Sequence, residues 1–380
     1  MDLRAMKLRM LKRVLSPPEV CVGRGSVDRL SCLDPARVLV VAGESARPTG
    51  ALERVTGQLK DATALEAIEL GGEPRAASLG AAQAAVAAFA PAWIVAVGGG
   101  AVLDGAKFLW AQFEHPDLVL SGATAAIGPL RRKARLIAVP TTAGSGSEAS
   151  QVAVLSSDDG TKIPYVSPDW VPDLAILDPG LTVSLPREIT VATGFDALTH
   201  AVESAVSSLG NALLQALAAT AVGLVLRHLP AAAETPHDLV AREGMLEAAY
   251  LAGLCQSAAS TGAAHALSHA TSKLHGAPHA AATGFYLLPT VRWNRTKNAA
   301  LYDPLAAACG LASGAALATA IADLATRVGL PQKFAELLGR TPDDSERQAL
   351  AGAAAKDVCL RTNACRMGTP ELAQLLAEIG

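Results

Sequence analysis

The chain has 380 residues, of which 51% are hydrophobic but only 4% aromatic. That length is sufficient for two ordinary domains with sizeable cores. The net charge of −3 and the pI near 6.3 exclude the strongly basic surface that binding to nucleic acid or to an anionic membrane requires.

The cysteines and the N-terminus bear on the cellular compartment. The six cysteines are scattered and form no CxxC pair, which predicts reduced thiols in a cytoplasmic protein. In the basic segment 1–13, charged residues interrupt every apolar run, so the core of a signal peptide is missing. The most apolar later stretch, 211–226, is too short to span a bilayer and predicts a buried helix. We therefore expect a cytoplasmic protein with neither a membrane nor a nucleic-acid partner.

The first half of the chain alternates short apolar runs with alanine-rich stretches of helical periodicity. Continuous apolar runs predict strands that are buried on both faces, and they occur at 38–43, 64–70, 93–100 and 136–148, the last ending in a small-residue loop. Helices are predicted at 49–59, 81–90 and 102–113. This alternation favours an α/β domain with a parallel, doubly wound sheet.

The character of the sequence changes near residue 183. Pro186 suits the first turn of a helix, and from there to the C-terminus the periodicity is almost entirely helical. We expect an α/β domain at 1–183 and an all-α domain at 184–380.

Two loops of small residues follow predicted strands. GGGAVLDGAK (98–107) opens a helix, where backbone N–H groups can hold a pyrophosphate. PTTAGSGSE (140–148) carries small hydroxyl side chains on a glycine-rich loop. Either one alone also suits an ordinary turn, and the first matches neither G-x-G-x-x-G nor a P-loop. Because ligands bind at the carboxyl ends of parallel strands, the two loops together predict a dinucleotide site.

Histidines and one aspartate cluster in the second half. The candidates are Asp196, His200, His265, His269, His275 and His279. The first two share a helix face at i, i+4, and so do His265 and His269. A carboxylate with several imidazoles predicts a divalent ion such as Fe²⁺ or Zn²⁺, with a position left open for a substrate. A lone Asp–His pair on a helix is more often a surface or capping interaction. Because four ligands suffice for one ion, one or two of the five histidines should face the substrate or support a ligand.

Together these motifs resemble the iron-containing (group III) alcohol dehydrogenase family. The resemblance covers nearly the whole chain, through GGGAVLDGAK, PTTAGSGSE, DPGLTVSLP, TGFDALTHAVES and HALSHATSKLHGAPHA. It implies a dehydroquinate synthase-like architecture, in which the active site lies between a Rossmann-like N-terminal domain and an all-helical C-terminal domain. By motif position, the implied metal ligands are Asp196, His200, His265 and His279. His269 matches a family histidine that lies near the substrate and is not usually a ligand.

The resemblance also implies a nicotinamide dinucleotide beside Fe²⁺ or, alternatively, Zn²⁺. The implied cofactor contacts are Gly98, Gly99, Gly100, Ala101 and Asp104, then Thr141, Thr142 and Ser145, and further on Val154 and Lys162. NAD-using members often carry an aspartate after the first strand, where this chain has Gly43, with Arg47 nearby. The missing carboxylate favours NADPH over NADH, because nothing there repels a 2′-phosphate. Glu44 remains able to bind a ribose.

The implied reaction is reversible hydride transfer between the nicotinamide and a small primary alcohol or aldehyde, in a homodimer. The metal polarises the substrate oxygen, and His269, together with His275, would relay the proton. Small apolar residues near the histidines favour a compact aldehyde, namely Ala263, Ala264, Ala266, Leu267 and Ala277. Segments 43–50 and 162–179 are similar to family members that reduce phosphonoacetaldehyde.

Other activities stay open. Maleylacetate reductases also carry PHA, as at 278–280 here, where most of the family has PHG. Dehydroquinate-synthase-like lyases and sugar-alcohol dehydrogenases share the two-domain plan, but they carry more basic residues for their substrates. A non-catalytic dinucleotide-binding protein is a further alternative, against which the intact set of metal ligands argues.

Overall fold

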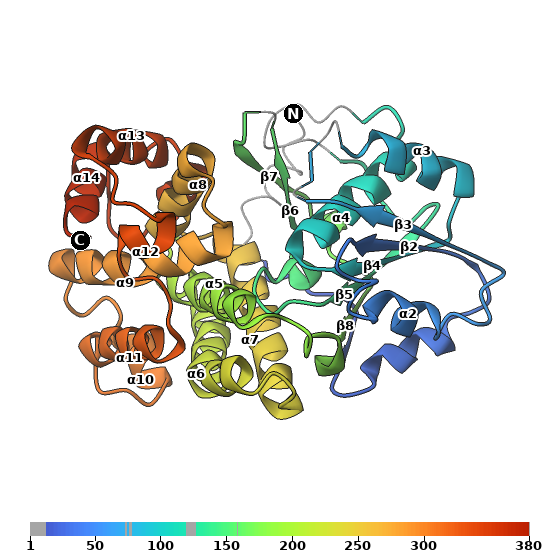
Figure 1. Ribbon diagram of the computed structural model, residues 1–380, viewed down its shortest axis with the longest axis horizontal. Coiled ribbons are helices and arrows are strands. Elements are labelled where there is room, and N and C mark those ends of the chain that lie inside the picture. Colours follow the sequence, from blue (N-terminus) through green and yellow to red (C-terminus); the bar gives the residue numbers. More distant parts are fainter. Residues whose placement is uncertain (1–12, 73, 76–77, 119–126, 158, 380) are drawn as a thin grey trace.

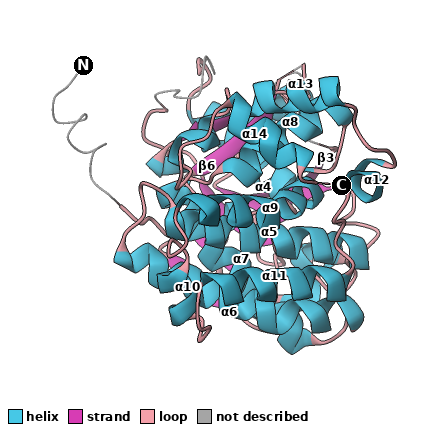
Figure 2. Ribbon diagram, turned by 90° about the vertical axis from the view of Figure 1, so that its left-hand side faces the viewer, coloured by secondary structure: helices cyan, strands magenta, loops and turns pink. Residues whose placement is uncertain are grey.

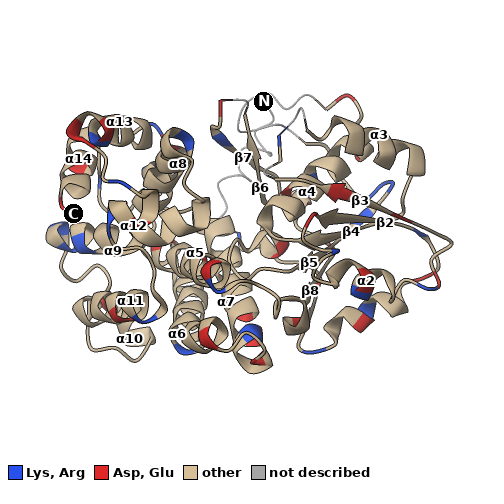
Figure 3. Cartoon of the chain, in the orientation of Figure 1, with Lys and Arg blue, Asp and Glu red and all other residues tan. Residues whose placement is uncertain are grey.

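The computed structural model describes residues 13–72, 74–75, 78–118, 127–157 and 159–379. The basic N-terminal segment therefore lies almost wholly outside the described residues. A sheet-containing part and a helical part lie side by side (Figure 1). Seen from the helical side, helices cover most of the molecule (Figure 2). Acidic and basic residues are interspersed along both parts, in line with the small net charge (Figure 3).

The N-terminal part is built on a parallel six-stranded sheet in the order β1-β8-β5-β4-β2-β3. Its strands are β1 (Glu19–Val22), β2 (Arg37–Gly43), β3 (Ala64–Leu70), β4 (Trp93–Gly98), β5 (Arg135–Pro140) and β8 (Leu174–Leu177). The helices between them are α2 (Ala51–Thr56), α3 (Gly80–Phe89) and α4 (Gly100–Glu114). An antiparallel hairpin, β6 (Val152–Ser156) and β7 (Lys162–Val166), stands apart from the sheet. The predicted α/β fold is confirmed.

The burial of β2 explains why the central strands are apolar without alternation. Leu39 and Val41 pack in one core cluster, together with residues of α3 and α4. Val38 and Val40 pack in another, with residues of α2. Side chains alternate between the two faces of a strand, so a strand covered on both sides must be apolar at every position.

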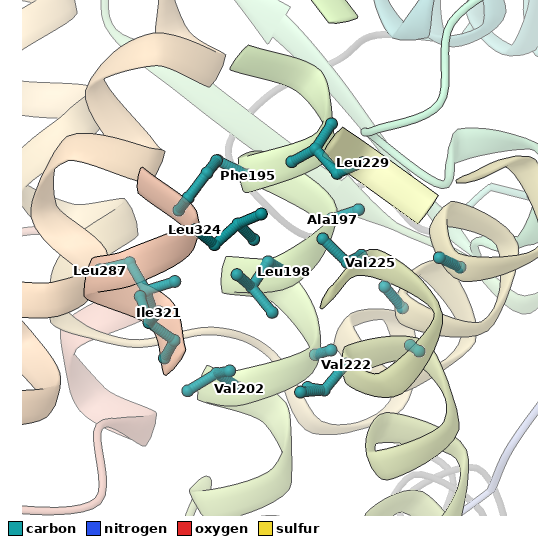
Figure 4. Packing of buried hydrophobic residues seen from close by; sticks show 14 of the residues in the cluster. Phe195, Ala197, Leu198, Val202, Val222, Val225, Leu229, Leu287, Ile321 and Leu324 are labelled. Carbon is teal, nitrogen blue, oxygen red and sulfur yellow. The ribbon is translucent and has the colours of Figure 1, made fainter. Parts of the chain in front are cut away.

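The C-terminal part is helical, as expected. Its helices are α5 (Arg187–Val206), α6 (Ala212–Glu234), α7 (Leu239–Ala259), α8 (Ala263–His275), α9 (His279–Lys297), α10 (Asp303–Ala308), α11 (Gly314–Val328), α12 (Phe334–Leu338), α13 (Asp344–Ala354) and α14 (Thr369–Ala377). Pro186 is the N-cap of α5, and the expected boundary near residue 183 falls between β8 and this helix. Phe195, Leu198 and Val202 of α5 lie among apolar side chains of neighbouring helices (Figure 4). That packing fixes the position of α5.

Helix α6 is longer than predicted. It runs from Ala212 to Glu234, so by length and composition alone it could cross a membrane, and the prediction that it is too short was wrong. In the structure α6 packs against α5 and α7, and Val222 and Val225 on its inner face are fully buried. A core helix in a helical bundle has this arrangement.

Close backbone packing joins the two parts. Gly146, in the loop after β5, lies against the backbone of Gly253 in α7, and its φ of +63° suits glycine. Gln151 donates from both its backbone and its side chain to Ser257, at 3.0 and 2.8 Å. The second small-residue loop is therefore held directly on the helical part.

Candidate metal and dinucleotide site

The predicted metal ligands come together where three helices meet. Asp196 lies on α5, His265 on α8, and His279 at the start of α9. One ligand atom of each lies within 4.8 Å of the other two. His200, one turn along α5, stacks on the ring of His265 with 4.6 Å between centroids. Its place as the fourth ligand stays a prediction.

The spacing of these atoms suits an ion between them. Asp196 Oδ1 lies 3.8 Å from His265 Nε2 and 4.0 Å from His279 Nε2, too far for a hydrogen bond. Atoms about 2.1 Å from one ion stand roughly 3.4 Å apart at a tetrahedral angle, and further apart at wider angles. Within the described part of the chain, Asp196 Oδ1 and His265 Nε2 are buried without a hydrogen-bond partner. Because buried polar atoms are normally paired, this donor set fits a divalent ion.

Polar partners hold the other nitrogen of two histidines. His265 Nδ1 lies 2.6 Å from Glu203 Oε2, and Glu203 also accepts hydrogen bonds from two backbone N–H groups at the start of α8. His279 Nδ1 lies 3.0 Å from Ser268 Oγ. Such partners fix the ring orientation and leave Nε2 as the atom that can bind a metal.

Burial keeps the imidazoles neutral. It lowers the pKa of His200 and of His265 to about 4, and it lowers the pKa of His279 well below its usual value. Burial also raises the pKa of Glu203 to about 7. Neutral imidazoles offer their lone pairs to an ion near neutral pH without first losing a proton.

His269 lies beside the metal group. Its ring centroid is 5.2 Å from that of His279, and its Nδ1 lies 2.8 Å from Asp357 Oδ2. Asp357 is itself held by a hydrogen bond from the backbone N–H of Cys359. Because Asp357 occupies Nδ1, Nε2 is the nitrogen that can exchange a proton. The predicted place of His269 near the substrate is compatible with this geometry.

The structure does not bring His275 to the cluster. It is the last residue of α8, and its Nδ1 lies 3.4 Å from Nη2 of Arg340. His275 is six positions after His269, which turns it by about 120° around the helix axis. The predicted part of His275 in proton relay therefore has no support in the geometry.

The two small-residue loops meet at the carboxyl ends of β4 and β5. The backbone N–H of Thr141 donates to the carbonyl of Gly98 at 3.0 Å. A Cβ added to Gly100 would lie 2.6 Å from Ser145 Oγ. Helix α4 begins at Gly100 without a side-chain cap, so its first N–H groups can bind an anion such as a pyrophosphate. A cleft of about 330 Å³ opens beside Ala101, between β3 and α3.

Three of the predicted cofactor glycines also allow close packing. A Cβ at Gly43 or at Gly98 would lie 2.9 or 2.6 Å from the side chain of Val102. One at Gly99 would lie 3.4 Å from the side chain of Thr142. Glycine lets α4 pack tightly on the strand ends and leaves the backbone accessible to a phosphate.

Asp104 uses both its oxygens within the protein. Oδ1 accepts from Ser147 Oγ at 2.6 Å, and Oδ2 accepts from the backbone N–H of Val154 at 3.0 Å. Nearby, the fully buried Lys107 donates from Nζ to three backbone carbonyls within 147–152, at 2.7 to 2.9 Å. Asp104 and Lys107 thus tie α4 to the second loop. The predicted contact of Asp104 with the cofactor stays a prediction beside this supporting role.

Two further basic residues near these loops are Lys162 and Arg47. Burial is the main influence on the pKa of Asp104 and of His279, and the positive charge of Lys162 acts on both. The charge of Lys162 therefore acts on both the first loop and the metal group. Arg47 Nε lies 3.1 Å from a carboxylate oxygen of Glu69, which lines the cleft beside α4.

The apolar residues next to the histidines belong to the core. Ala263, Ala264, Ala266 and Leu267 are fully buried in a cluster with residues of α9, α13 and α14. They pack helices together, so their small size reflects the packing of this core.

Comparison with known proteins assigns the family. A model described as iron-containing alcohol dehydrogenase matches residues 17–179, and one for the C-terminal part of the Fe-containing alcohol dehydrogenase family matches residues 190–380. The chain belongs to the iron-containing alcohol dehydrogenase family. An NADPH-dependent butanol dehydrogenase of Clostridium saccharobutylicum is 32% identical over 80% of this chain and 79% of that protein.

Solved structures support the same assignment. An iron-containing alcohol dehydrogenase from Thermococcus thioreducens has a TM-score of 0.86 and 29% identity, covering 96% of this chain and 98% of that one. A sulfoacetaldehyde reductase from Bifidobacterium kashiwanohense, in complex with NAD⁺, has a TM-score of 0.86 and 27% identity, covering 97% and 99%. These matches confirm the two-domain fold and the activity class, an NAD(P)-dependent alcohol dehydrogenase or aldehyde reductase.

Two supporting carboxylates were not identified from the sequence. Glu203 follows Asp196 by seven residues and shares its face of α5, so helical periodicity gave a usable signal. Asp357 is 88 residues from His269, and no local pattern links the two.

Proposed function

We propose that this chain holds Fe²⁺ through Asp196, His200, His265 and His279 and, with NADPH, interconverts a small primary alcohol and its aldehyde. One observation carries the proposal: ligand atoms of Asp196, His265 and His279 converge within 4.8 Å, with buried oxygen and nitrogen atoms left unpaired. A bound divalent ion would supply Lewis acidity toward the substrate oxygen. The same donors suit Zn²⁺, so the choice of Fe²⁺ follows the family.

His269 is the residue proposed to move the proton. Asp357 holds its Nδ1, which leaves Nε2 to take the proton from an alcohol or to return it to an alkoxide. The two loops beside α4 would hold the pyrophosphate and so direct the nicotinamide toward the metal group.

The proposal of NADPH rests on Arg47. Its partners Glu53 and Glu69 are exposed, and ion pairs of this kind contribute at most about 1 kcal/mol. A 2′-phosphate offers stronger charge-assisted hydrogen bonds and can replace them. The cleft lined by Glu69 and Ala101 is the proposed place of the adenosine end. Among the relatives, one is NADPH-dependent by name and another was solved with NAD⁺.

A second candidate substrate class is a short aldehyde with an anionic head group, such as phosphonoacetaldehyde. The positive charge of Lys162 reaches His279 and would attract such a head group near the metal. One structural relative is a sulfoacetaldehyde reductase.

The test is an absorbance assay of NADPH and NADH oxidation on anaerobically purified protein. Uncharged and anionic short aldehydes are compared, with Fe²⁺ or Zn²⁺ restored after chelation. We expect metal-dependent oxidation of NADPH, and we expect H265A to lose both metal and activity. Full activity of H265A, or oxidation that is unaffected by the chelator, would overturn the proposal. Turnover of anionic aldehydes alone, weakened in K162M, would select the second class.

We also propose a cytoplasmic homodimer. All six cysteines are free, as reduced thiols are in the cytoplasm. Within the described residues β1 is an edge strand, and Val22 is exposed there, so its open side can pair with a second copy. Light scattering after size exclusion tests this, since a monomer mass at micromolar concentration would contradict it.

A further inference from the structure

A second group of potential metal ligands lies next to the site described above. His269, Asp357 and Cys359 each offer one ligand atom, and these atoms lie within 4.8 Å of one another. We propose that this group binds a second divalent ion that favours sulfur, such as Zn²⁺ or Co²⁺, and that its occupation inhibits the enzyme.

The three side chains are brought together by α8 and a distant turn. Asp357 is the N-cap of a short 3₁₀ helix, η5 (Val358–Thr362), and its Oδ1 accepts from the backbone N–H of Cys359 at 2.8 Å. Its Oδ2 lies 2.8 Å from His269 Nδ1. The side chains of His269 and Asp357 are each 16% exposed and Cys359 is 8% exposed, so the group is nearly buried but still reachable.

The distances allow an ion to replace the contact between His269 and Asp357. His269 Nδ1 and Asp357 Oδ2, now 2.8 Å apart, can both bind one ion at about 2.1 Å with a ligand–ion–ligand angle near 90°. A small increase in their separation widens this angle to the tetrahedral value. On binding, the Cys359 thiol loses its proton to solvent, and the imidazole proton of His269 is carried on Nε2. One proton is released for each ion bound.

Charge and ligand type decide which ion binds. One carboxylate and one thiolate cancel the two positive charges, so the buried centre is neutral. Neutrality also matters because the rings of His269 and His279 are only 5.2 Å apart, and a charged centre would repel the ion of the first site. A thiolate favours Zn²⁺ or Co²⁺ over Mg²⁺ and Mn²⁺.

Inhibition follows from the proton on His269, and this part rests on the proposed function. An imidazole that binds an ion through Nδ1 already carries a proton on Nε2. It therefore cannot accept another proton from an alcohol.

Cobalt titration of the metal-free protein tests the site without measuring activity. A thiolate bound to Co²⁺ gives an intense near-ultraviolet charge-transfer band, which a site made of Asp196 and histidines lacks. We expect two Co²⁺ per chain and this band in the wild type, and one Co²⁺ without the band in C359S. H265A should keep the band. C365S is the matched control and should keep both ions, because Cys365 is half-buried and contacts the carbonyl of Asn294, outside the group.

Zinc titration of the iron-loaded enzyme tests the inhibition. With iron retention checked by metal analysis, we expect Zn²⁺ to reduce wild-type activity and to leave C359S at its own starting activity. No band in the wild type at two equivalents of Co²⁺, or a band that persists in C359S, would overturn the site. A cobalt–thiolate band together with activity that Zn²⁺ does not reduce would confirm the second metal site but overturn both the inhibition and the proton role of His269. The two measurements thus separate failure of this inference from failure of the proposed function.

Discussion

Replacing Glu203 by glutamine tests whether this carboxylate positions the metal group. Its Oε2 lies 2.6 Å from His265 Nδ1 and accepts the backbone N–H of Gly262 at 2.8 Å, and its Oε1 accepts the backbone N–H of Ala264 at 2.7 Å. A glutamine has one carbonyl oxygen, and its NH₂ group would face at least one of these donors. A buried donor left without an acceptor costs about 1–3 kcal/mol, and loss of such a partner weakens metal binding roughly 10- to 100-fold.

Both effects can be measured on the same protein. Metal affinity is obtained by competition with a chromophoric chelator, and stability from the Tm of the metal-free protein. The control is Glu188→Gln, an exposed position in the first turn of the same helix, which should behave as the wild type. If Glu203→Gln binds metal as tightly as the wild type, Glu203 does not orient His265, and the reasoning is refuted.

Three further predictions concern the dinucleotide loops. Burial lowers the pKa of Lys107 from 10.5 to about 8. Between these two pH values Lys107 is protonated in the unfolded chain but neutral in the folded one, so the free energy of unfolding should rise with pH. At about 1.4 kcal/mol per pH unit, the free energy of unfolding should rise by roughly 3 kcal/mol. Urea unfolding at several pH values should show this rise for the wild type and not for Lys107→Met. Gly146→Ala should lower the free energy of unfolding, followed through the Tm, by several kcal/mol, because the new Cβ would collide with the backbone of α7. The control is Gly160→Ala, where φ is also positive (+80°) but no atom lies within 4 Å of the new Cβ, and it should cost about 1 kcal/mol. Arg47→Ala should raise KM for NADPH about tenfold more than KM for NADH, and equal changes would contradict the NADPH assignment.

The sheet could be predicted from the sequence because a strand that is buried on both faces is apolar at every position. Every residue of 38–41 is apolar, and neighbouring residues enter opposite core clusters. The ends of helices were harder to predict from local sequence. The predicted helix 211–226 continues through Pro230 to Glu234, although proline normally ends a helix. Pro230 is buried in the bundle, so tertiary packing outweighs the local preference.

The candidate site was predictable to the extent that it lies on single helices. Asp196 with His200, and His265 with His269, were paired correctly by helical spacing alone. His275 has no such support, because closeness in sequence does not give a shared face, and its ring lies beside Arg340. The contact between His269 and Asp357 depends on how α8 packs against a segment far along the chain, and only tertiary structure could show it.

Helix α5 links the fold to the site. Phe195, Leu198 and Val202 form one stripe that packs into the helical core (Figure 4). Asp196, His200 and Glu203 form another stripe, roughly on the opposite side of the helix, and it is also buried. A buried polar stripe destabilises the fold unless each group finds a partner. Glu203 finds backbone N–H groups, but Asp196 Oδ1 finds no partner among the described residues. An ion bound there would supply the missing interaction, so metal binding and the stability of this part of the fold are coupled.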